Sequence, residues 1–432
     1  MKTVMKKILF GILVFIMAVF AYIYINDEFR HDKIAEGSIV YIVPVYGQSL
    51  ALGEEAQPVT DFTHYGDSTY HRVKTQYLDE KFGYFSLDLL KQRIKRILHS
   101  KNRQFETSVY GLGKAFADAR LGDNVYLCTF PAGQGETGIE KLGSGSAAYD
   151  KMIAELKMAY DEAHSMGCKV EVPAICWMQG ENDLVWETGK NYSMLLKQFR
   201  ADFERDVKKI SRQHRSVECI LYQTNCLSLS RDSFVWNAYN CKQMRVPEAQ
   251  RQLIVSDRHF HASGPVYPYN VMREYVHIDG EGQYRVGYLE GLTLCRLLKG
   301  QSFEGLQMDD ICRNADTLIV SFKVPCRPLM LDTLTVSKVS NYGFSVIDSA
   351  NHDILQEVLL RDDKVYLVCD GKRGTVDNAV VRYGCNGEYW KSGRKSGPRG
   401  NLCDSQGKAV KCAVNSKVFD VANWCYFFEK GR

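Results

Sequence analysis

The chain has 432 residues, of which 45% are hydrophobic and 25% are charged. This composition is ordinary for a globular protein with room for two or three domains, and it excludes a chain too polar to fold. The 55 basic and 51 acidic residues leave a net charge of only +4, and no long block of one sign follows the N-terminus. So small and dispersed a charge argues against nucleic acid as a partner.

An apolar segment opens the chain. Lys2, Lys6 and Lys7 precede residues 8–25, a run of 18 residues without a charge, and about 17 to 25 apolar residues span a bilayer as a helix. Positive residues in front of such a run stay in the cytoplasm, so the remainder is exported. We predict that residues 1–26 form a signal anchor facing the extracytoplasmic side, or a signal peptide whose cleavage leaves a secreted or periplasmic protein.

Residues 37–300 alternate between short apolar runs and longer segments with helical spacing. Near-continuous apolar strands that alternate with helices indicate a parallel sheet covered on both faces. The predicted fold class is therefore α/β, with a doubly wound parallel sheet of the flavodoxin-like kind. The predicted strands are residues 38–46, 124–130, 169–177, 217–224 and 251–257, and the predicted helices are residues 87–98, 147–165, 192–210 and 284–298.

Residues 302–432 have a different pattern. Short alternating segments at residues 315–325, 331–339, 342–349, 364–371 and 378–384 are separated by Asp, Asn and Gly. This spacing predicts an appended all-β domain resembling a β-sandwich. Fourteen cysteines would suit an exported protein, and the best disulfide candidates stand in polar sequence near the C-terminus: Cys385, Cys403, Cys412 and Cys425.

Polar residues follow several of the predicted strands. The first strand runs into Gly47-Gln48-Ser49, the second into Gly135-Glu136-Thr137, and the third into Gln179-Gly180-Glu181-Asn182. His277 precedes the last predicted helix. Ligands of open parallel sheets bind at the carboxyl ends of the strands, so we expect these residues to meet at one edge of the sheet.

The residue types indicate nucleophilic catalysis. A serine hydroxyl needs a neighbouring base, and histidine is the side chain suited to that role near neutral pH. Ser49 is the predicted nucleophile and His277 the predicted base. Glu274, three residues before His277, and Glu181 are two candidates for the carboxylate that orients the histidine ring.

Attack on an ester creates an oxyanion, which requires hydrogen-bond donors already in place. Gly135 can present its backbone N–H without a side chain in the way, and the Ser49 N–H is a further donor. Either Gln179 or Asn182 can add a side-chain amide. We predict no metal site and no cofactor, because the histidines lack the spacing of metal ligands; His259 and His261 form only an HxH pair.

Four blocks of sequence together resemble the SGNH hydrolase superfamily and, within it, the sialate O-acetylesterase-like carbohydrate esterases. The opening block, often GQSN, stands here as Gly47 to Leu50, and the second block, close to GGTxIE, as Gly135 to Glu140. The third, WxQGExD, is complete from Trp177 to Asp183, and the last, DxxH followed by glycines, reads Glu274 to His277. The order of the blocks matches the family over residues 37–300.

The resemblance implies an SGNH-type esterase domain with Ser49 as nucleophile, His277 as base and Gln179 as oxyanion donor, whereas the wider superfamily's GxND pattern nominates Asn182. We favour Gln179 because Trp177 and Glu181 fit the carbohydrate-esterase pattern. Two departures stand out: Leu50 replaces an asparagine, and Glu274 replaces an aspartate.

The function expected from these features is removal of O-acetyl groups from the sugars of a glycan, either sialate or another polysaccharide. The partners expected are thus an O-acetylated carbohydrate and, through the N-terminal helix, a membrane. Two alternatives stay open. The same serine could pass the acetyl group to a sugar hydroxyl if water is excluded, as an acetyltransferase does, or the esterase scaffold could be a glycan-binding protein without activity.

Overall fold

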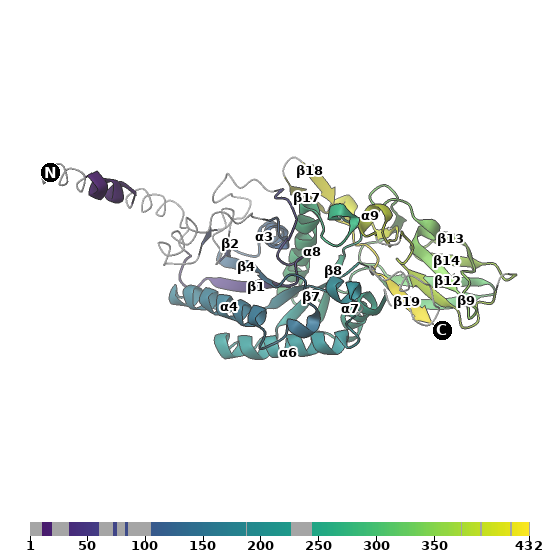
Figure 1. Ribbon diagram of the computed structural model, residues 1–432, viewed down its shortest axis with the longest axis horizontal. Helices are drawn as coiled ribbons and strands as arrows, with labels where there is room; N and C mark the ends of the chain where they lie inside the picture. The colour runs from purple at the N-terminus through teal and green to yellow at the C-terminus, as the bar shows by residue number, and fades with distance from the viewer. Residues whose placement is uncertain are drawn as a thin grey trace.

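The structure is a computed structural model that describes residues 11–19, 34–59, 72–75, 83–84, 105–186, 188–225, 244–372, 374–388, 391–414 and 417–431. Its larger part is built on one parallel sheet (Figure 1), in the order β3-β2-β4-β1-β6-β7-β8, with β5 also paired to β1. The strands of this sheet are β1 (Ile39–Gly47), β2 (Val73–Thr75), β3 (Gly83–Tyr84), β4 (Val125–Gly133), β5 (Lys169–Glu171), β6 (Ala174–Met178), β7 (Glu218–Gln223) and β8 (Phe260–Pro265). The predicted α/β class is confirmed.

Strand β1 lies in the middle of the sheet, and its apolar run is buried on both faces. Ile42 and Tyr46 pack into one hydrophobic core, while Val43 and Val45 pack into another on the opposite face. Alternate side chains of a strand point to opposite faces, so a strand covered by helices on both sides needs an apolar residue at nearly every position. The continuous run of the sequence follows from that requirement.

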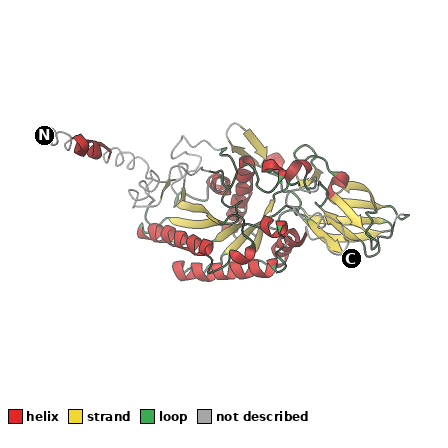
Figure 2. Cartoon of the chain, viewed as in Figure 1, coloured by secondary structure: helices red, strands yellow, loops and turns green. Residues whose placement is uncertain are grey.

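Helices cover both faces of the sheet (Figure 2). The helices are α3 (Ser108–Ala119), α4 (Ala147–Ser165), α5 (Glu181–Val185), α6 (Tyr192–Ser211), α7 (Arg245–Ser256) and α8 (Gly280–Leu298). The predictions for residues 147–165, 192–210 and 284–298 are confirmed by α4, α6 and α8. The predicted helix at residues 87–98 lies outside the described residues.

The predicted strand at residues 251–257 is wrong, because that segment belongs to helix α7. Its buried side chains include Val246, Gln250, Leu253 and Ile254, which recur at the spacing of one helix face. The strand that follows, β8, has the sequence FHASGP, whose small and polar residues give little β signal. Burial between neighbours, and not local propensity, makes that segment a strand.

The C-terminal part is an all-β domain, as predicted. The domain has one sheet in the order β13-β14-β10-β9 and a second sheet in the order β12-β15-β19. Buried side chains of both sheets pack into one hydrophobic core. The strands of these sheets are β9 (Gln307–Asn314), β10 (Thr317–Lys323), β12 (Phe344–Ile347), β13 (Leu355–Arg361), β14 (Lys364–Cys369), β15 (Val380–Tyr383) and β19 (Phe428–Gly431). Two further antiparallel pairs join β11 (Leu329–Leu331) to β16 (Leu402–Asp404) and β17 (Lys411–Val414) to β18 (Lys417–Asp420).

Two details of this domain differ from the sequence predictions. Residues 333–337 in the predicted strand at residues 331–339 form a turn, because the carboxylate of Asp332 accepts hydrogen bonds from the N–H groups of Leu334 and Thr335. Such a side-chain turn competes with strand formation. The predicted disulfide candidates Cys403, Cys412 and Cys425 are free thiols in buried positions, and Cys385 is buried too.

The β-domain is joined to the α/β domain by buried hydrogen bonds. Gln223, at the end of β7, is fully buried; its amide donates to the carbonyl of Phe427 and accepts from the Phe427 N–H. The hydroxyl of Tyr426 accepts from the N–H of Gly264 at 2.8 Å. A buried polar group that lost such a partner would carry the cost of desolvation, so these bonds fix the two domains against each other.

Of the predicted N-terminal apolar segment, residues 11–19 are described and are helical. In the described portion of the chain, no helix combines the length and the apolar character needed to cross a bilayer. The remainder of the segment lies outside the described residues.

Candidate active site

The predicted site residues meet at the carboxyl ends of β1, β4 and β6. The three strand tips approach closely, since a Cβ on Gly47 would lie 2.0 Å from the carbonyl oxygen of Met178, and a Cβ on Gly133 would lie 2.0 Å from that of Gly47. Only glycine fits at both positions. The glycine that ends the first apolar run thus allows the neighbouring strands to bring their loops beside Ser49.

Ser49 and His277 are in direct contact, although 228 positions separate them in the sequence. Ser49 Oγ lies 2.7 Å from His277 Nε2, and Ser49 is 3% exposed. This is the geometry in which the serine hydroxyl donates to the histidine and can pass its proton to it. The predicted pairing of nucleophile and base is thus present.

The third member of the chain of contacts is Glu55, which the sequence analysis missed. Glu55 Oε2 lies 3.0 Å from His277 Nδ1. A ring N–H donated there leaves Nε2 free to accept from Ser49. Glu55 belongs to the turn that directly follows Ser49, in which the Glu54 N–H donates to the Ser49 carbonyl at 3.0 Å. Its φ of 64° is left-handed, and this uncommon backbone conformation was not visible as a sequence signal.

Electrostatics keep Glu55 ionised. The hydrogen bond from His277 holds the pKa of the Glu55 carboxyl below its ordinary value despite some desolvation, and the charges of His277 and Arg273 act in the same direction. The nearest guanidinium nitrogen of Arg273 is 4.0 Å from Glu55 Oε1. A carboxylate beside the ring stabilises the imidazolium that forms when the serine is deprotonated.

The two predicted orienting residues have different surroundings. Glu181 is buried and accepts a hydrogen bond from the hydroxyl of Tyr222 at 2.5 Å. Burial raises the pKa of Glu181 above its usual value, against the hydrogen bonds and the charge of His277. Glu274 ends the short helix η5 (Met272–Glu274) just before His277, and its side chain lies outside the described part of the structure. Among the side chains that the structure describes, the carboxylate in contact with Nδ1 of His277 is that of Glu55.

Gln179 is fully buried and engaged in the protein interior. Its Nε2 donates to the carbonyl of Thr137 at 3.2 Å and to Asp183 Oδ2 at 2.5 Å, and its Oε1 accepts from the Tyr192 hydroxyl at 2.9 Å. An amide nitrogen has only two hydrogens to donate. This corrects the expectation for Gln179, because both hydrogens already have partners and neither faces the reacting group.

Asp183 completes the same network and explains the last position of the third block. Its Oδ2 also accepts from the N–H of Ile139 at 2.9 Å, and its Oδ1 accepts from the Thr188 hydroxyl at 2.7 Å. These bonds attach the loop of the second block to helix α5. The family-like residues Gln179 and Asp183 therefore hold the walls of the site in position.

Three other donors remain near Ser49. The backbone N–H groups of Ser49 and Gly135, and the side-chain amide of Asn182, have no hydrogen-bond partner among the described residues. Asn182 is fixed close to the nucleophile, because its backbone N–H donates to Gln48 Oε1 at 3.1 Å. Of these three donors, Asn182 is the one that the GxND pattern nominates. Leu50, which replaces the asparagine usual in the first block, is fully buried in the hydrophobic core that includes side chains of α3 and α8.

The β-domain supports the loop that carries His277. The Arg394 N–H donates to the carbonyl of Tyr269 at 3.1 Å, and its guanidinium donates to Asn270 Oδ1 at 2.8 Å. Farther along the same loop, the Met272 N–H donates to the carbonyl of His277 at 2.6 Å. The appended domain thus braces the histidine loop from outside the α/β domain.

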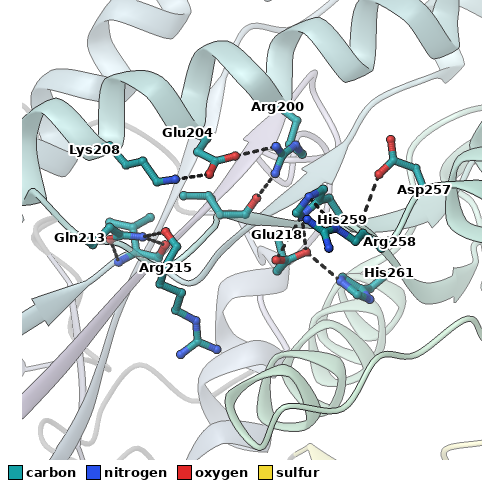
Figure 3. A network of polar contacts seen from close by, with 12 residues as sticks. Arg200, Glu204, Lys208, Gln213, Arg215, Glu218, Asp257, Arg258, His259 and His261 are labelled. Atoms are coloured by element: carbon teal, nitrogen blue, oxygen red, sulfur yellow. Dashed lines mark hydrogen bonds and ion pairs between the residues drawn. The ribbon is translucent and has the colours of Figure 1, made fainter.

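The HxH pair lies at the other end of the sheet. His259 and His261 flank Glu218 (Figure 3), with His261 Nε2 at 3.1 Å and His259 Nδ1 at 3.3 Å from its carboxylate oxygens. Glu218 begins β7, so this cluster is at the amino ends of the strands, away from Ser49. Across the described ranges, no group of three or more His, Cys, Asp or Glu side chains is arranged to hold a metal ion.

Comparisons with known proteins show which family and which fold this chain resembles. Residues 80–265 match the family model described as carbohydrate esterase, sialic acid-specific acetylesterase. The match includes the second and third blocks and confirms the resemblance to this family. The matched residues make up less than half of the chain and do not include Ser49 or His277. A search of curated protein sequences gives no match.

One solved structure shares the fold over most of the chain. A carbohydrate acetylesterase from Xanthomonas citri superimposes with a TM-score of 0.55 at 12% identity, covering 90% of this chain and 80% of its own. A carbohydrate acetylesterase from Sinorhizobium meliloti has a TM-score of 0.33 at 14% identity, covering 60% of this chain and 99% of its own. The first of these extends over both domains of the chain.

Proposed function

We propose that the protein is a serine O-acetylesterase that removes acetyl groups from sugars of a glycan through an acetyl-enzyme intermediate. The observation that carries the proposal is the chain of contacts from Ser49 to His277 to Glu55, at 2.7 and 3.0 Å, at the tip of the central strand. Such a chain supplies a nucleophile, a base and an orienting carboxylate. The family match supports the acetyl ester as substrate class.

The residues act in two steps. Ser49 Oγ attacks the acetyl carbonyl carbon while His277 Nε2 takes its proton, and the tetrahedral oxyanion is held by the N–H groups of Ser49 and Gly135 and the amide of Asn182. When the intermediate collapses, the sugar oxygen leaves and takes the proton from His277. Water, deprotonated by the same histidine, then attacks the acetyl-Ser49 ester and releases acetate.

Substitution of the nucleophile tests this proposal. Ser49→Ala should abolish acetate release from 4-nitrophenyl acetate and from acetylated glycans while the circular dichroism spectrum and Tm stay close to wild type, because the hydroxyl forms the acyl bond. A folded Ser49→Ala enzyme with wild-type turnover would exclude Ser49 as the nucleophile. Analysing products for acetate against acetylated sugar separates hydrolysis from transfer.

We also propose that the protein is exported and held on the membrane by its N-terminal apolar run. The support is the 18-residue uncharged sequence at residues 8–25 behind Lys6 and Lys7, because such a run has about the length that spans a bilayer. The protein should stay with membranes washed in high salt. A mature N-terminus between Ala21 and Asp27, found in the soluble fraction, would show a cleaved signal in place of an anchor.

A further inference from the structure

A pocket of about 300 Å³ opens between the loop of the second block and helix α5. Asn182 lines it, together with Glu136, Glu140, Lys141 and Trp186. The two walls of this pocket are the same segments that supply the donors beside Ser49. Gly135 directly precedes the lining residue Glu136, and Asn182 is both a lining residue and one of the donors. A group bound in the pocket would thus sit next to an ester held at the nucleophile.

Trp186 gives the pocket an aromatic wall that the proposed mechanism does not use. Its side chain is 66% exposed, whereas Trp177 and Trp424 are buried. The backbone N–H of Trp186 donates to the carbonyl of Asn182 at 3.0 Å, which holds the Trp186 backbone one helical turn from Asn182. A large flat ring with one apolar face in water is suited to stack on the C–H face of a sugar ring.

The charges around the pocket discriminate between kinds of sugar. Glu136 and Glu140 are exposed carboxylates, against one cation, Lys141. Asp183, also in the lining, adds a further negative charge although it is buried and hydrogen-bonded. A ligand carboxylate would meet like charges here, while sugar hydroxyls could donate to the carboxylates.

From these features we infer that this pocket is the subsite for the sugar ring of the substrate, with Trp186 as its stacking platform, and that it takes an uncharged sugar in preference to a sialic acid. The inference rests on the proposed function and narrows its substrate class. Trp186 is a specificity-determining residue in this account.

The test compares three esters: 4-nitrophenyl acetate, which has no sugar, an O-acetylated xylo-oligosaccharide, which is uncharged, and an O-acetylated sialic acid. Trp186→Ala should lower kcat/KM on the oligosaccharide about tenfold more than on 4-nitrophenyl acetate, mainly through KM, as expected for the loss of one stacking contact. Trp186→Tyr should recover most of that loss. Leu334→Ala, which truncates a 98% exposed side chain of the β-domain, is the matched control and should equal wild type on all three esters.

Several outcomes would overturn the inference: an equal loss on the sugar and sugar-free esters, no loss on the oligosaccharide, or a wild-type preference for the sialic acid. Calorimetric binding of the acetylated oligosaccharide to Ser49→Ala, with and without Trp186→Ala, measures the subsite without turnover. Weaker binding in the double variant supports the subsite, and equal binding refutes it. Failure of the proposed function is distinct, because it would be seen as persistent turnover by folded Ser49→Ala.

Discussion

Removal of the Glu55 carboxylate should slow the chemical step while leaving substrate binding nearly intact. Glu55 makes one hydrogen bond to His277, at 3.0 Å, and its side chain is 41% exposed. A hydrogen bond to a charged group contributes about 1.5 to 3 kcal/mol when well shielded, and exposure to solvent reduces this toward about 1 to 2 kcal/mol. We expect Glu55→Ala to lower kcat roughly 5- to 30-fold with little change in KM.

The assay is steady-state hydrolysis of 4-nitrophenyl acetate, with Tm measured to confirm folding. Glu55→Gln keeps an acceptor for the Nδ1–H but loses the charge, so its loss should be smaller than that of Glu55→Ala. Glu274→Ala and Glu181→Ala are made alongside as the two carboxylates nominated by sequence. A folded Glu55→Ala enzyme within twofold of wild type, or a larger kcat loss in Glu274→Ala, would refute the assignment of Glu55 as the orienting group.

Two further predictions concern the amides and a buried acid. Asn182→Ala should lower kcat by a factor on the order of 10² to 10³ with a nearly constant KM, because the oxyanion loses a donor. Gln179→Ala should chiefly lower the free energy of unfolding, by roughly 1 to 3 kcal/mol, because it leaves buried polar groups unpaired. Steady-state kinetics and denaturant titration distinguish the two effects, and the reverse pattern would show that Gln179 is the oxyanion donor. Burial raises the pKa of Glu290 from 4.5 to about 8, against the lowering effect of Ser108. Between about pH 4.5 and 8 the folded state holds a proton that the unfolded state has lost, so the free energy of unfolding should fall as pH rises, by up to about 1.4 kcal/mol per pH unit. In urea titrations at several pH values, Glu290→Gln should remove this slope. An unchanged slope in Glu290→Gln would contradict the raised pKa of Glu290.

The sequence by itself determined the parts that depend on local pattern and on strand direction. Continuous apolar runs separated by helical segments are typical of a parallel sheet that is buried on both faces. Parallel strands bring their carboxyl ends to the same edge of the sheet. That reasoning placed Ser49 and His277 together, and the structure has them 2.7 Å apart. The predicted helix at residues 147–165 is present as α4 for the same reason, because its apolar spacing is a local pattern.

Tertiary structure alone decided which polar side chains face the reaction. Gln179 and Asn182 stand three residues apart and carry the same amide group. The amide of Gln179 is bonded to the Thr137 carbonyl and to Asp183, which leaves Asn182 as the amide donor for the oxyanion. Glu55 became the partner of His277 through a left-handed turn and a contact across 222 positions. Local propensity fixes neither a contact of that span nor the partner that satisfies a buried donor, because both depend on where the rest of the chain packs.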